Sequence, residues 1–188
     1  LQAAQTATPP SGFGPNIIAL THALAQQCCD HDLSLLLNDN LPEQVEELRQ
    51  AFRAQLCDDR IRLWSAPQSA GRAVAEAVRE AALAALQPDV VLVPSPFEGF
   101  SDPAVVSVGR FAPDLPTVML IGTPPDPHQI SEVKVGASFA AARFEHLQQA
   151  SLCLLDPALS AAQIAQLGLA PQQGIALSHN LTAESIQA

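Results

Sequence analysis

Asp126 and His128 have the residue types and the spacing that proton abstraction from a hydroxyl group requires. They follow the apolar run Val118–Ile121 and could orient each other as a base and its partner. Prolines flank Asp126 on both sides, however, and favour a rigid surface connection instead. The pair is a candidate for catalysis, and the sequence points to no further catalytic residue.

A glycine-rich segment, Gly12-Phe13-Gly14, precedes a helical pattern that starts at Ile17. Glycines allow the backbone to approach a ligand, and free N–H groups at a helix start attract a phosphate or a sugar hydroxyl. Pro15 removes one of these donors, and two glycines at this spacing are also common in simple turns. A ligand-binding loop and a turn both remain open.

A second binding candidate is Phe97-Glu98-Gly99, which follows the apolar run Val90–Val93. Glu98 lies between Phe97 and Phe100, so its carboxylate could bind sugar hydroxyls while the rings stack on the sugar. In the alternative interpretation the two phenylalanines anchor the core, and Asp102 caps a helix.

The sequence predicts no metal site. Its cysteines lack a C-x-x-C spacing, and the adjacent pair Cys28 and Cys29, with His31 nearby, is interpreted as reduced thiols. The motifs of serine hydrolases, zinc proteases, P-loop kinases and classical dehydrogenases are also missing from the sequence. Asp156, which follows the run Leu152–Leu155, is expected to cap the next helix.

The composition indicates one folded domain that does not bind nucleic acid. The chain has 188 residues, of which 48% are hydrophobic and only 15% are charged. A formal net charge of −10, with scattered cationic residues, opposes binding to nucleic acid or to anionic membrane surfaces. No apolar run in the sequence reaches the length of a transmembrane span, and we expect a cytoplasmic protein.

The elements that position these residues alternate between two hydrophobic periods. Short runs rich in Val, Leu and Ile predict buried strands, and apolar residues three or four apart predict helices. The predicted strands are Leu33–Leu37, Ile61–Trp64, Val90–Val93, Val118–Ile121, Leu152–Leu155 and Ile175–Leu177. The predicted helices contain Ile17–Leu24, Val45–Leu56, Ala70–Leu86, Asp102–Phe111, Gly136–Gln149 and Ala158–Leu167, the last ended by Gly168.

This alternation predicts an α/β fold, namely a doubly wound, mainly parallel Rossmann-like sheet with helices on both faces. Strands that are apolar throughout need cover on both faces, which flanking helices supply. Such a sheet begins with a central strand, but Leu1–Ser11 is rich in Gln, Ala, Thr and Pro and is expected to be irregular. We therefore expect a single domain over residues 1–188 with a truncated first strand, most of which would precede Leu1.

A series of landmarks occurs in a characteristic order along the chain. They are Leu1–Thr6, Gly12–Gly14, Leu24–Gln26, Leu35–Asp39, Arg60-Ile61 with Trp64, Pro88–Val93, Phe97–Gly99, Phe144–Leu147 and Leu167–Leu169. This order resembles the amino-terminal, acceptor-side domain of the retaining, mannosyltransferase-like GT-B enzymes of bacterial polysaccharide synthesis, glycosyltransferase family 4. The resemblance covers nearly the whole chain and makes the fold one half of a GT-B fold.

The resemblance implies two Rossmann-like domains that face each other across a cleft. The first handles a sugar or polysaccharide acceptor and the second a nucleotide-sugar donor. It implies that Gly12, Phe13 and Gly14 lie near the donor phosphates and that Glu98 lies by the acceptor cleft. The paired glutamates that grip the donor belong to the carboxyl-terminal GT-B domain, a partner missing from this chain, so we expect this chain alone to bind no cofactor and to transfer no sugar.

The chain departs from the family's pattern at three polar positions. Pro15-Asn16 stands where the family has Arg-Tyr, Ile121-Gly122 where it has an aromatic-Asp or His-Asp pair, and Asp156–Ala158 where a serine-rich turn ends in Arg. The sequence therefore supports part of a hexosyltransferase or, alternatively, a degenerate, non-catalytic GT-B-like module that binds glycan or protein. An unrelated doubly wound domain of the flavodoxin-like or periplasmic binding type is the third interpretation.

Overall fold

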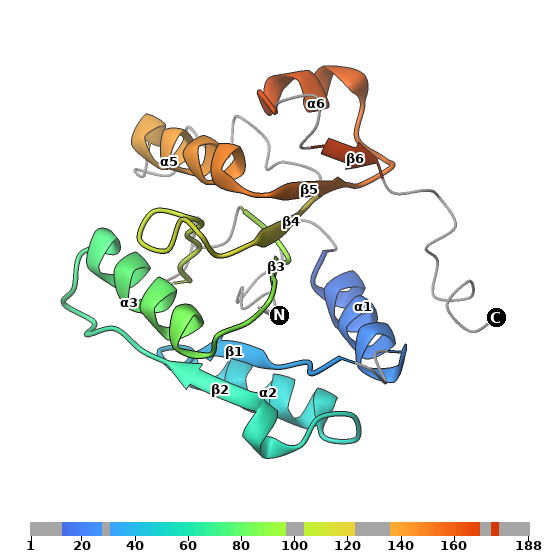
Figure 1. Cartoon of the computed structure of the whole chain (residues 1–188), viewed down its shortest axis with the longest axis vertical. Helices are drawn as coiled ribbons and strands as arrows, with labels where there is room; N and C mark the ends of the chain where they lie inside the picture. The colour runs from blue at the N-terminus through green and yellow to red at the C-terminus, as the bar shows by residue number, and fades with distance from the viewer. Residues whose placement is uncertain (1–12, 28–30, 97–103, 123–135, 170–173, 177–188) are drawn as a thin grey trace.

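The computed structural model describes residues 13–27, 31–96, 104–122, 136–169 and 174–176. Helices and parallel strands follow one another along most of these residues and confirm the predicted α/β class (Figure 1). The elements are α1 (Phe13–Gln27), β1 (Leu35–Asn38), α2 (Pro42–Phe52), the 3-10 turn η1 (Asp58–Arg60), β2 (Ile61–Trp64), α3 (Arg72–Ala85), β3 (Val91–Val93), β4 (Thr117–Ile121), α5 (Gly136–Gln149), β5 (Leu152–Leu155), α6 (Ala161–Gln166) and β6 (Gly174–Ala176).

The strands form two groups, and every pair within them is parallel. β1 pairs with β2, and Leu35 lies opposite Ile61. The second sheet has the order β3-β4-β5-β6, and in its centre Met119 of β4 lies opposite Cys153 of β5. Parallel neighbours require a crossover between consecutive strands. Helices α2, α5 and α6 lie in the crossovers from β1 to β2, from β4 to β5 and from β5 to β6, whereas the described residues between β3 and β4 contain no helix. The prediction of a mainly parallel Rossmann-like sheet is confirmed.

Helices cover both faces of β1 because alternate residues of a strand point in opposite directions. On one face, Leu35 and Leu37 share a core with residues of α2, such as Val45 and Phe52, and with partly buried residues of α1. On the other face, Leu36 belongs to a second core. The run of leucines in β1 is therefore buried on both sides, as its uniformly apolar sequence predicts.

The second core lies between α3, α5, α6 and the strands. Leu83 of α3, Leu147 of α5 and Leu167 at the end of α6 all belong to it. From the strands it takes Leu36, Trp64, Val91, Val93, Met119, Ile121, Cys153 and Leu155. One continuous core thus joins residues of both sheets beneath the same layer of helices.

Two predictions about α6 have different outcomes. Gly168 ends the helix with a φ of +62°, a conformation that glycine adopts without strain, and this confirms the predicted stop. The prediction that Asp156 caps this helix is wrong. The Asp156 side chain accepts a bond from the Ala158 N–H at 2.8 Å, whereas Ser160 forms a capping box with Gln163 and starts the helix.

The predicted helix over Asp102–Phe111 is wrong in its described part, because residues 104–112 form neither helix nor strand. Three of its buried residues, Val105, Val106 and Val108, are β-branched and lose side-chain freedom in a helix. The carbonyl oxygens of Val106 and Ser107 also accept bonds from buried arginines of α5 and α3 instead of from the segment's own N–H groups. Tertiary contacts therefore replace the helical ladder here.

Candidate functional site

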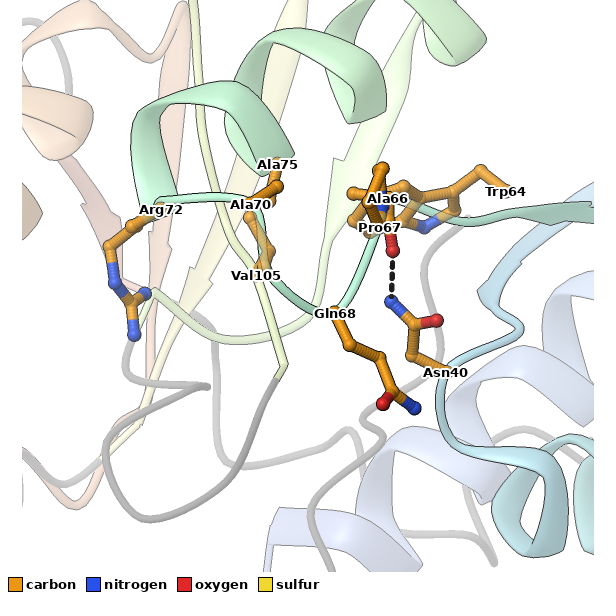
Figure 2. A pocket seen from close by; sticks show the side chains of 9 residues that line it. All are labelled: Asn40, Trp64, Ala66, Pro67, Gln68, Ala70, Arg72, Ala75 and Val105. Atoms are coloured by element: carbon orange, nitrogen blue, oxygen red, sulfur yellow. Dashed lines mark hydrogen bonds between the residues drawn. The ribbon is translucent and has the colours of Figure 1, made fainter.

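A cavity of about 430 Å³ lies at the carboxyl ends of β1 and β2. Asn40 borders it from the turn after β1, and Trp64 borders it from the last position of β2 (Figure 2). Its other lining residues are Ala66, Pro67, Gln68, Ala70, Arg72, Ala75 and Val105. In parallel sheets ligands bind at this edge, and the volume is within the range of small-molecule sites.

Hydrogen bonds fix the turn that carries Asn40. The Asn40 N–H donates to the side-chain oxygen of Asn38 at 3.0 Å, and the Asn40 side-chain amide donates to the Ala66 carbonyl at 2.9 Å (Figure 2). The Asp39 N–H donates to the Trp64 carbonyl at 2.9 Å. The two loops that follow β1 and β2 are thereby tied together, so that the side-chain oxygen of Asn40 keeps a defined position at the cavity.

The cavity combines an apolar wall with polar groups at its mouth. Trp64, Ala75 and Val105 are buried and form the wall. Gln68 is exposed and lines the cavity together with Asn40 (Figure 2). Arg72, also exposed, is the first residue of α3 and brings a positive charge to the positive end of the helix dipole.

This arrangement suits binding rather than covalent chemistry. The amides of Asn40 and Gln68 both donate and accept hydrogen bonds, as recognition of hydroxyl groups requires. Arg72 donates only, and it can bind a hydroxyl or an anionic oxygen. Among the described residues that line the cavity, none carries a carboxylate, an imidazole, a thiol or a hydroxyl group.

A buried polar network supports the wall of this cavity. Arg79 of α3 donates to the Ser107 carbonyl at 2.7 Å, and Arg143 of α5 donates to the Val106 carbonyl. The Val108 N–H donates to Nδ1 of His146 at 3.2 Å. These bonds hold the irregular segment that contains Val105, so the network acts on the cavity through this backbone.

Glu76 and Glu80 complete the network from α3. One oxygen of Glu80 accepts from the N–H groups of Phe111 and Ala112 at 2.7 and 2.9 Å. Glu76 lies 3.1 Å from Nη1 of Arg110 and 3.8 Å from Nε2 of His146. Because Nδ1 of His146 accepts a hydrogen bond from Val108, the imidazole presents its Nε2 side to Glu76.

The surroundings of Glu76 lower the pKa of its carboxyl group. Burial alone would raise this pKa, but His146, Arg143 and Arg110 favour the ionised form and outweigh burial. The opposite case is Cys153, where burial raises the thiol pKa to about 11. Cys153 is therefore a core residue and not a nucleophile at neutral pH.

The structure describes few of the sequence-predicted site residues. Phe13 and Gly14 lie in the first turn of α1, which begins four residues earlier than the pattern from Ile17 indicates. Gly12, Phe97, Glu98, Gly99, Asp126 and His128 lie outside the described residues. Their binding and catalytic roles stay predictions.

The sequence interpretation missed Asn40, Gln68 and Arg72. A signal was present, because these residues follow two predicted strands, at the edge where parallel sheets bind ligands. Neither loop contains a glycine pair, an aromatic-carboxylate pattern or an acid-base pair. The sequence interpretation relied on such patterns, and they occur in other loops.

The described residues contain no cluster of histidine, cysteine or carboxylate side chains that could hold a metal ion. Within the same residues, no helix has both the length and the hydrophobicity to cross a membrane.

The chain is similar to two Escherichia coli proteins that are each described as serotype-specific mannosyltransferase WbdA. It is 30% identical to one over 118 residues and 31% identical to the other over 99 residues. These matches cover 57% and 47% of the chain but only 14% and 12% of the relatives. The similarity supports a relationship to a glycosyltransferase family. No family model matches the chain, and no solved structure matches it.

Proposed function

We propose that the chain is the acceptor-side domain of a retaining, nucleotide-sugar-dependent glycosyltransferase of the GT-B type and of glycosyltransferase family 4. The enzyme would act in the cytoplasm in the synthesis of bacterial cell-surface polysaccharide. The 30% identity over 118 residues with a mannosyltransferase carries this proposal. The parallel Rossmann-like sheets and the cavity at their carboxyl edge support it.

The cavity has the chemistry of a sugar-acceptor site. Neutral sugars present many hydroxyl groups and some apolar C–H surface, so they need amides for the former and an apolar wall for the latter. Asn40 and Gln68 provide the amides, and Trp64 provides part of the wall. We propose that a terminal sugar of the acceptor binds here.

The remaining parts of the reaction belong to groups beyond this cavity. In the proposal, a second GT-B domain binds the nucleotide-sugar, and Gly12, Phe13 and Gly14 approach its phosphates. Phe97, Glu98 and Gly99 contribute to acceptor binding, and Asp126 with His128 stays the candidate pair for proton transfer. Positioning and charge stabilisation would supply the rate enhancement, so the isolated chain would transfer no sugar.

A non-catalytic module that binds glycan or protein is the second candidate. It is favoured by the cavity, whose described lining residues include no acid, base or nucleophile. The two candidates differ in the longer protein, where only the enzyme would form product from a nucleotide-sugar and an acceptor.

Calorimetric titration of the 188-residue chain tests the proposal. We expect a mannose trisaccharide to bind with a Kd of about 1 mM and nucleotide-activated mannose to show no binding. Gln68→Ala removes one amide and should weaken trisaccharide binding about fivefold, the worth of one hydrogen bond. Arg53→Ala, an exposed change at the far end of α2, is the matched control and should bind normally.

Two outcomes of this titration would contradict the proposal. One is binding of the nucleotide-sugar by the isolated chain. The other is trisaccharide binding that is absent, or that Gln68→Ala and Arg53→Ala leave equally unchanged.

A further inference from the structure

We propose that His146 positions one wall of the cavity and that protonation of this residue weakens ligand binding. His146 is a positioning residue, because it acts on the cavity only through the backbone of residues 105–108. The inference rests on the proposed function, since the ligand concerned is the proposed sugar acceptor. It adds to that function a dependence of binding on pH.

The hydrogen bonds of His146 define the form of its ring. The side chain is 2% exposed, Nδ1 accepts the Val108 N–H at 3.2 Å, and Nε2 lies 3.8 Å from Oε1 of Glu76. A ring nitrogen that accepts a hydrogen bond carries no proton, so the imidazole is neutral in this arrangement and its hydrogen is on Nε2. A second proton has to bind to Nδ1.

Protonation of Nδ1 turns this acceptor into a donor. The Nδ1–H of His146 and the N–H of Val108 would then face each other, and the hydrogen bond between them is lost. A buried N–H group without a partner is unfavourable, so the backbone at Val108 has to move. It belongs to the segment of residues 104–112, which forms neither helix nor strand and depends on bonds to other elements.

The other bonds to this segment keep their form when the pH falls from 7.5 to 5.5. Arg79 and Arg143 donate to backbone carbonyls of the segment through guanidinium groups, which stay protonated. Glu80 accepts through a carboxylate, a group that ordinarily titrates near about pH 4. The bond to His146 is therefore the one that can change in the pH range where histidine ordinarily titrates.

The titratable and charged groups of the network around His146 come from α3, α5, β5 and the irregular segment; they are Glu76, Arg79, Glu80, Arg110, Arg143 and Cys153. Although burial raises it, the pKa of Glu76 lies below the ordinary value, mainly because of His146, so its carboxylate can serve as the counter-charge of a protonated ring. Arg110 and Arg143 oppose a further positive charge. Cys153 is a neutral thiol, because burial raises its pKa to about 11. A protonated ring would thus keep Glu76 on its Nε2 side and lose Val108 on its Nδ1 side.

The backbone that His146 holds continues into the wall of the cavity. Val105 is 7% exposed and lines the cavity together with Trp64 and Ala75. A short stretch of backbone joins it to Val108, so release of Val108 loosens the support of this side chain. A wall that is ordered before the ligand arrives favours binding, because less order has to be created in the complex. Protonation of His146 therefore lowers the affinity.

Calorimetric titration with the mannose trisaccharide at pH 7.5 and pH 5.5 tests the effect on binding. We expect binding to the 188-residue chain to be about fivefold weaker at pH 5.5, the worth of one hydrogen bond. His146→Gln supplies an amide oxygen that can accept the Val108 N–H at both pH values, so its affinity should change by less than about twofold. His31→Gln, which replaces an exposed histidine, is the matched control and should follow the parent chain.

Hydrogen exchange of the Val108 amide in the ligand-free chain tests the release itself. The protection factor removes the intrinsic effect of pH on exchange. We expect it to be about fivefold lower at pH 5.5 than at pH 7.5 in the parent chain and in His31→Gln. In His146→Gln it should be the same at both pH values.

Two results would overturn the proposal. One is a Val108 protection factor that does not differ between the two pH values in the parent chain. The other is a trisaccharide affinity that changes equally with pH in the parent chain and in His146→Gln. A trisaccharide that binds at neither pH would contradict the proposed function instead, and the Val108 amide of the ligand-free chain then decides whether His146 releases the wall.

Discussion

Charged side chains in the interior are the main residue-level feature of this protein. Glu76, Arg79, Glu80, Arg143 and His146 are all at most 2% exposed. Burial of such groups is unfavourable unless each has partners, and here the partners are backbone groups of residues 106–112 and one another. Bonds to this network, and not helical hydrogen bonds of its own, therefore hold the segment that forms one wall of the cavity.

The pKa of Glu76 makes stability depend on acid pH. Its pKa in the folded state lies below the ordinary value of 4.5, so the folded state holds the ionised form more strongly than the unfolded state does. The resulting stabilisation is complete above pH 4.5 and is lost as the pH falls through the lower, folded-state pKa. Denaturant unfolding from pH 7 to pH 3 should show this loss.

Glu76→Gln provides the comparison for this pH dependence. The variant should be less stable at pH 7, because Arg143 and Arg110 lose their counter-charge, and its stability should fall less between pH 5 and pH 3. A variant whose stability follows the same pH profile as the parent chain would show that Glu76 is not the group responsible.

The sequence could not reveal this network because its members are far apart in the chain. Arg79 and Ser107 are 28 residues apart, and Val108 and His146 are 38 apart. Within the predicted helix Ala70–Leu86, the sequence does not distinguish a glutamate or an arginine that faces the interior from one that faces solvent. Only the fold brings the partners together.

At the level of elements, hydrophobic periodicity predicts the strands well and fails in one segment. Each predicted strand is present, and Gly136–Gln149 has the predicted helix bounds. The failure is Asp102–Phe111, where a pattern of apolar residues was interpreted as a helix. Its valines favour extended backbone, and its hydrogen bonds go to α3 and α5, which no local pattern can show.

Arg79→Met should loosen this segment. The change removes the donor to the Ser107 carbonyl and leaves that oxygen buried without it, at a cost of about 3 kcal/mol in the free energy of unfolding. Chemical denaturation measures the loss. Arg53→Met, an exposed change, is the control and should alter stability by less than about 0.5 kcal/mol. Equal stability of the two variants would show that the arginine bond does not support the segment.

At the level of the whole molecule, the two parallel sheets share a core and place a polar cavity at the carboxyl end of the first. The sequence predicted the class of fold, because it follows from the alternation of strands and helices. That ligands bind at the carboxyl edge of the strands, where the cavity lies, stays a prediction. The sequence did not predict which loops form the cavity, since the polar residues of the loops after β1 and β2 carry no distinctive motif. The single-domain organisation over residues 1–188 stays a prediction.

The central claim, that the cavity at the carboxyl ends of β1 and β2 binds a sugar acceptor, has a direct probe. Trp64 is the only tryptophan of the chain and lines the cavity, so fluorescence reports on this site alone. Titration with a mannose trisaccharide should change the emission of Trp64 to a plateau, at a midpoint equal to the calorimetric Kd. An emission spectrum that stays constant while calorimetry records binding would place the sugar elsewhere and contradict the claim.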